Sequence, residues 1–127
     1  GNQYIMNEAD GILGSFDLLL TTASGISIEG LDSLMKDYGG LWYPAHIDRN
    51  SYSIISSLGD FSTGLDTPCF ELTYEADEKF YRDKYPATKN KKLIRSSDAH
   101  YLENLMTEKM EIEPADNSIK GLFEVLR

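Results

Sequence analysis

The feature that most constrains the fold of this chain is an alternation of helical and strand-like segments. An apolar stripe over residues 27–38 predicts a helix there. Shorter helices are expected over 51–58, where Gly59 would stop the helix, and over 76–84, ended by Pro86. Short apolar runs at 41–45, 69–73 and 92–95 predict buried strands between and after them. Such alternation is typical of an α/β protein, with a parallel sheet built from right-handed crossovers. We therefore expect a single α/β unit over residues 1–127.

Capping residues set the expected ends of these helices. Ser27 is a suitable N-cap for the first helix, and Gly39 is placed to end it in a left-handed conformation. Ser51 is expected to cap the second helix, and Asn117 or Ser118 a last one near the C-terminus. Three further short segments are expected: an extended segment or strand over residues 3–8, a buried strand or short helix over 16–22, and an exposed strand around 109–113.

Composition and charge exclude several classes of protein. The net charge of −9 argues against nucleic acid as a partner, because phosphate backbones are held by Lys- and Arg-rich surfaces. No apolar run approaches the roughly 18 residues of a membrane span, so no membrane partner is expected. Cys69 is the only cysteine, which excludes an internal disulfide and fits a reducing compartment. We therefore expect a cytoplasmic protein.

Both histidines of the chain follow predicted strands. His46 comes directly after the run at 41–45, while Asp98 and His100 follow the run at 92–95. In α/β proteins, binding and catalytic sites are built at this end of the strands. Residues i and i+2 of an extended segment project to the same side, and a carboxylate with an imidazole suits Zn, Mn or Fe. The alternatives are a capping Asp98 beside a surface His100, and a buried His46 satisfied by backbone groups.

Two motifs in this region resemble a known family. The segment Gly-Gly-Leu-Trp-Tyr-Pro-Ala-His-Ile-Asp-Arg at 39–49, followed by Ser-Asp-Ala-His at 97–100, is similar to the last two motifs of the PHP (polymerase and histidinol phosphatase) metal-dependent phosphoesterases. The resemblance runs from about Ile26 to Leu105. The family's opening His-x-His strand, Asp-His pair and Glu ligand cannot be placed here. The chain thus resembles the C-terminal half of a PHP domain, which implies part of a distorted (βα)7 barrel.

The resemblance also implies a site. His46, Asp98 and His100 match ligands that PHP proteins share among two or three metal ions, which activate a hydroxide for attack on a phosphate ester. Arg49 is a candidate contact for the substrate phosphate; the alternative is an ion pair with a nearby acid such as Asp48.

Glu71, inside the predicted strand 69–73, is a candidate acceptor for a histidine N–H. The alternative is an ordinary buried glutamate with a local partner.

Three ligands are too few for such a centre. Each ion needs about three or more protein groups, so we expect a full-length parent to hydrolyse a small phosphorylated substrate with Zn, Mn or Fe, and this chain alone to be inactive. The alternative is a non-catalytic accessory or binding module. Half of a barrel also leaves strand edges and an apolar face uncovered. We expect self-association of the fragment, or rearrangement of residues 3–22, to cover them.

Overall fold

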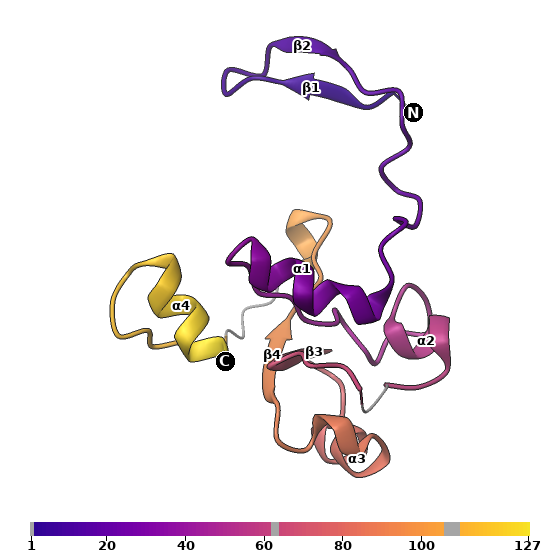
Figure 1. Cartoon of the computed structure of the whole chain (residues 1–127), viewed down its shortest axis with the longest axis vertical. Helices are drawn as coiled ribbons and strands as arrows, with labels where there is room; N and C mark the ends of the chain where they lie inside the picture. Colours follow the sequence, from indigo (N-terminus) through magenta and orange to yellow (C-terminus); the bar gives the residue numbers. More distant parts are fainter. Residues whose placement is uncertain (1, 62–63, 106–109) are drawn as a thin grey trace.

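The computed structural model describes residues 2–61, 64–105 and 110–127. Figure 1 shows a body of short helices around a small sheet, with a hairpin extended away from it. None of the helices in the described parts of the chain has the length and hydropathy needed to cross a bilayer. The elements in chain order are β1 (Tyr4–Met6), β2 (Ile12–Ser15), η1 (Ile28–Gly30), α1 (Leu31–Asp37), α2 (Ile54–Leu58), β3 (Cys69–Thr73), α3 (Glu78–Lys84), η2 (Pro86–Thr88), β4 (Lys92–Ser96), η3 (Leu102–Asn104) and α4 (Ile119–Leu126).

The parallel pair β3–β4 is the centre of the body. Its register runs from Cys69 opposite Lys92 to Thr73 opposite Ser96. This confirms the two predicted strands at 69–73 and 92–95 and the α/β character of the chain. A parallel pair needs a long crossover, and α3 with η2 provides it.

The predicted strand at 41–45 lies beside β3 without forming a regular ladder. Glu71 N donates to Pro44 O at 3.0 Å, and Ile47 N donates to Glu71 O at 2.9 Å. Two residues, Ala45 and His46, lie between these bonds where a regular parallel ladder has one. The extra residue bulges the backbone, and His46 takes a φ of 30°. The prediction of a strand was therefore wrong, although the segment does flank the sheet.

A compact core packs on one face of β3. Five apolar or aromatic residues, each at most 6% exposed, form this core: Ile47, Phe61, Phe70, Leu72 and Tyr85. Phe70 and Leu72 project to the same face because side chains alternate along a strand. Partly buried residues of α2, α3 and β4 complete this cluster, so the core ties both helices to the sheet.

The capping predictions are largely confirmed. Ser27 Oγ accepts a hydrogen bond from Gly30 N at 3.2 Å, and Gly39 follows the first helix at φ 66°. The second helix is capped by Ser53 instead of Ser51, because Ser53 Oγ both accepts from Ser56 N and donates to Arg49 O. Ser118 caps α4.

The described residues form no closed barrel. They contain two separate two-stranded sheets, β3–β4 and the antiparallel hairpin β1–β2. β1 confirms the expected extended segment, but residues 16–22 are neither the buried strand nor the helix that their apolar run predicts. Residues 110–113 are also not a strand, and residue 109 of that prediction lies outside the described residues.

Candidate functional site

A pocket of about 510 Å³ lies where the segment 44–47 and β4 end. All three residues predicted as metal ligands, together with Arg49, line it. Two loops that are far apart in the sequence therefore meet at one place, as the end-of-strand argument predicts. We call this the carboxyl-end pocket, and its lining residues are His46, Arg49, Ser51, Tyr52, Ser97, Asp98, His100, Tyr101 and Asn104.

The backbone around this pocket is strained. In the described part of the chain, four residues other than glycine have a positive φ, and three of them line the pocket: His46 at 30°, Tyr52 at 57° and Asp98 at 50°. Left-handed conformations of this kind cost of order 1 kcal/mol or more each, and they persist where the surroundings impose them. Such conformations cluster at functional sites, so the geometry itself marks this pocket.

A contact between His100 and Asp98 fixes which ring nitrogen of His100 donates a hydrogen bond. His100 Nδ1 lies 2.9 Å from the backbone carbonyl oxygen of Asp98. A carbonyl only accepts, so Nδ1 carries the proton, and Nε2 keeps its lone pair. The Asp98 carboxylate lies 4.0 Å from the same imidazole through Oδ1. This arrangement leaves one oxygen donor and one nitrogen donor available on neighbouring residues.

Arg49 reaches across the pocket to Asp98. Its Nη2 lies 3.9 Å from Asp98 Oδ2, at the outer limit of an ion pair. Both side chains are partly exposed, so this contact contributes little to stability. It does place a positive charge beside the carboxylate that was predicted to bind a metal cation.

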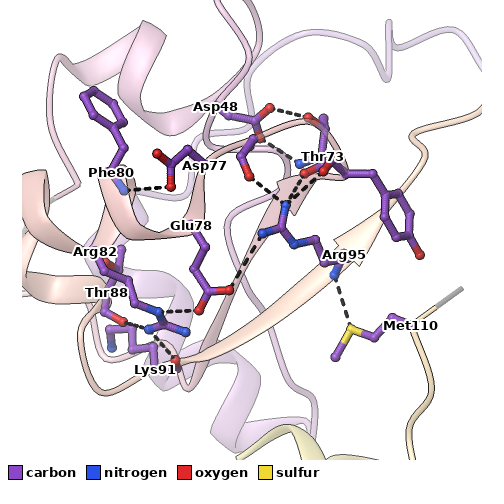
Figure 2. Close-up of polar contacts among 12 residues, drawn as sticks. Asp48, Thr73, Asp77, Glu78, Phe80, Arg82, Thr88, Lys91, Arg95 and Met110 are labelled. Carbon is purple, nitrogen blue, oxygen red and sulfur yellow. Dashed lines mark hydrogen bonds and ion pairs between the residues drawn. The ribbon is translucent and has the colours of Figure 1, made fainter. Parts of the chain in front are cut away.

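Asp48 fastens the first loop to the end of β3, and the acid that lies beside Arg49 is Asp98. Asp48 Oδ1 accepts from Thr73 N at 2.9 Å, and Asp48 Oδ2 accepts from Thr73 Oγ1 at 2.6 Å (Figure 2). Arg95 fixes the same end of β3 by donating to the carbonyl oxygens of Thr73 and Ala76 (Figure 2). These bonds hold the ends of segment 44–47, β3 and β4 together beneath the pocket.

Glu71 was expected to accept a hydrogen bond from a histidine, but the buried Nδ1 of His46 does not donate to it. Glu71 is only 7% exposed, and its Oε1 accepts from Ser96 Oγ at 2.8 Å. His46 Nδ1 is buried without a partner among the described residues. Burial, followed by the nearby Glu71 carboxylate, raises the pKa of Tyr43. Glu71 is thus a buried glutamate with a local partner, Ser96, which is the alternative considered from the sequence.

The donor chemistry fits a metal, but the donor count does not. One carboxylate and two imidazoles suit Zn, Mn or Fe. Within residues 2–61, 64–105 and 110–127, however, no three His, Cys, Asp or Glu side chains are grouped closely enough to hold one ion. His46, Asp98 and His100 share a pocket without forming a complete coordination shell.

Four residues of the pocket were not predicted as site residues: Ser51, Tyr52, Tyr101 and Asn104. The one indication in the sequence is that they closely follow the two motifs that contain His46 and His100. Comparison with known proteins adds nothing to this set: no family model, no curated protein and no solved structure matches the chain. The functional argument therefore depends on the pocket alone.

Proposed function

We propose that this chain is the C-terminal portion of a PHP-type metal-dependent phosphoesterase. The observation that supports this is the meeting of both motifs in one strained pocket at the carboxyl ends of segment 44–47 and β4. In this proposal, β3, β4 and the flanking segment 44–47 are parts of a distorted (βα)7 barrel. Other parts of a longer, cytoplasmic protein complete it.

Each polar residue of the pocket has a role in this reaction. Asp98 supplies an anionic oxygen and His100 supplies Nε2, because its Nδ1 proton is committed to a carbonyl. His46 supplies a further imidazole from the other loop. When bound, the metal ions supply Lewis acidity and a hydroxide at neutral pH. Arg49 presents a guanidinium for the phosphate of a small phosphorylated substrate.

The chain alone is proposed to be inactive. The three donors, His46, Asp98 and His100, are not grouped closely enough to hold one ion firmly, and a weakly held ion does not fix a nucleophile in line with phosphorus. The same observation favours the second candidate, a non-catalytic PHP-associated binding module. The two candidates differ in what the full-length protein does, since only the first requires phosphoesterase activity there.

Metal titration of the chain tests the site. We expect weak Mn²⁺ or Zn²⁺ binding by calorimetry, a shift of the His100 Nε2 resonance, and background hydrolysis of a generic phosphomonoester. Asp98→Asn should abolish the binding, while Asp66→Asn, an exposed carboxylate elsewhere, should leave it unchanged. Equal binding by both variants would contradict the assigned site. Turnover by the isolated chain would contradict the incomplete centre.

The full-length parent separates the two candidates. It should hydrolyse phosphomonoesters, and His100→Ala should remove most of that activity. A parent without phosphoesterase activity but with intact metal binding at Asp98 would favour the binding module.

A further inference from the structure

The N-terminal hairpin and the residues after it form an exposed apolar arm. Residues 2–20, which we call the N-terminal arm, lie apart from the body in Figure 1. A two-stranded hairpin alone is marginally stable in water, and a contiguous apolar surface marks an interaction site. Nine large apolar side chains of the arm are 42–70% exposed: Tyr4, Ile5, Met6, Ile12, Leu13, Phe16, Leu18, Leu19 and Leu20.

Gln3 makes the arm one ordered unit. Its backbone carbonyl accepts from Phe16 N at 2.8 Å, and its Oε1 accepts from Leu20 N at 2.6 Å. Its side-chain amide donates to the carbonyl oxygens of Phe16 and Leu18. Residues 16–20 are therefore held against β1 while Leu18 and Leu20 stay about 70% exposed. A pre-organised segment of this kind loses little entropy on binding.

The body carries a groove of matching character at the opposite end of the sheet from the carboxyl-end pocket. This amino-end groove, of about 620 Å³, lies between α1, the start of β3 and the turn before β4. Its apolar walls include Leu41, Trp42 and Pro68. The full lining is Asp32, Met35, Lys36, Gly40, Leu41, Trp42, Asp66, Thr67, Pro68, Pro86, Ala87, Asn90, Lys91 and Arg127.

The charges of the arm and the groove are complementary. The arm contains Glu8, Asp10 and Asp17 and has no Lys or Arg. In the groove, Asp32 and Asp66 already pair with Lys36. Lys91 and Arg127 have no carboxylate partner among the described residues. With Lys36 shared between two aspartates, the five charged side chains of the groove carry a net charge of +1, and the arm carries −3. The two surfaces therefore have net charges of opposite sign.

We propose that the N-terminal arm of one copy docks in the amino-end groove of a second copy. Leu18 and Leu20 pack against the walls around Trp42 and Pro68, and Asp17 lies towards Lys91 and Arg127. The exchange is reciprocal in a two-fold dimer, so each arm and each groove is used once. Figure 1 shows the arm extended away from the body that carries its own groove, which favours exchange over folding back.

The arm side is tested in the full chain by sedimentation and by the emission of Trp42, its only tryptophan. We expect a concentration-dependent dimer with a blue-shifted emission. The double variant Leu18→Ser/Leu20→Ser should raise the dissociation constant at least about tenfold, since two leucines lose their burial. Leu58→Ser, at a 60% exposed leucine on α2, is the matched control and should leave the dimer unchanged.

The groove side is tested with Asn90→Glu/Arg127→Glu, which changes two exposed residues and reverses the local charge. This variant should weaken the dimer severalfold, and raising the salt concentration should weaken the wild-type dimer. An equimolar mixture of the arm and groove variants should form a heterodimer, because the mixture keeps one intact arm and one intact groove.

Three results would overturn the proposal. A monomer at all concentrations would exclude exchange. Unchanged dimerisation of the groove variant would show that arms pair with each other. A Trp42 emission that differs between wild type and arm variant but does not change with concentration would show that the arm folds back onto its own groove.

Discussion

The two ends of the β3–β4 pair differ in backbone strain and in chemistry. The carboxyl-end pocket contains both histidines of the chain and three left-handed residues, whereas no residue lining the amino-end groove has a positive φ. Both ends contain ion-pairing side chains, but the pocket also contains two imidazoles and two tyrosines, while the groove has a tryptophan and two prolines in its walls. The same sheet thus has a pocket with strained backbone and both histidines at one end, and a groove without positive-φ residues at the other.

This difference implies that the two ends need different amounts of support from the rest of the fold. Left-handed residues are costly, and a rigid support is needed to keep them. Here that support is the core on β3 and the bonds from Asp48 and Arg95 that fix the strand ends. The groove needs no such support, because regular helix and turn residues form it. Substitutions at the shared core should therefore affect both ends, and substitutions at one end should affect that end alone.

The largest effect is expected from Phe70→Ala. Phe70 is fully buried, packs edge-on against Phe61 at 6.4 Å, and lies under the Arg82 guanidinium. Removing the ring should lower the free energy of unfolding by about 3–5 kcal/mol, as measured by urea denaturation. The pocket and the groove should be lost in one transition. Phe80→Ala, at a 49% exposed ring on α3, should cost much less; separate transitions for the two ends would break the shared-core argument.

The next largest effect concerns pH at the amino end, where β3 begins. Burial raises the pKa of the Cys69 thiol from 9.0 to about 11, although Lys91 and Lys92 oppose the shift. Between these values the unfolded chain releases the proton and the folded chain keeps it. The contribution of Cys69 to the free energy of unfolding should therefore be constant below about pH 9 and fall by about 2–3 kcal/mol as the pH rises to about 11.

Cys69→Ala isolates this contribution. Urea denaturation of both proteins at several pH values between 8 and 11 should show a steeper decline for wild type than for the variant. Parallel declines would mean that other groups, such as tyrosines and lysines, account for the alkaline loss.

A smaller and more local effect is expected from Asp48→Ala. The change removes two charge-assisted hydrogen bonds to Thr73, which should cost about 2 kcal/mol. The amide resonances of the carboxyl-end pocket should shift, and the emission of Trp42 at the amino end should stay constant. Asp48→Asn keeps one acceptor and should lose less. A clear change in Trp42 emission would show that the loss of the Asp48 bonds also alters the amino end, against the independence of the two ends.

Sequence patterns identified the parts of the fold that depend on local chemistry. Apolar runs located β3 and β4, and Ser27, Gly39 and Ser118 marked helix ends. The position of two histidines after apolar runs was enough to predict that both loops border one pocket. These predictions depend mainly on the chemistry of residues close together in the sequence, which a pattern can record.

The remaining features depend on contacts between distant segments. The bulge at Ala45–His46 arises from pairing with Glu71, which no local pattern encodes. The apolar run at 16–22 predicts burial, but in the structure its large apolar side chains are 42–70% exposed and lie in the arm, apart from the body. Ser51 and Ser53 are equally good caps by composition, and the bond from Ser53 to Arg49 O decides between them.

The smallest predicted effect compares single tyrosines from the two ends. Tyr52 lines the carboxyl-end pocket at φ 57° and is 93% exposed, so its side chain contributes little packing. Tyr52→Gly should raise the free energy of unfolding by about 0.5–1 kcal/mol, because glycine adopts this φ without strain. Tyr38 ends α1, which borders the amino-end groove, at φ −96° and is 81% exposed. Tyr38→Gly should lower stability by a similar amount, since glycine there only adds freedom to the unfolded chain. Thermal and urea denaturation should show opposite signs; two destabilised variants would mean that the carboxyl-end pocket is not held under strain at Tyr52.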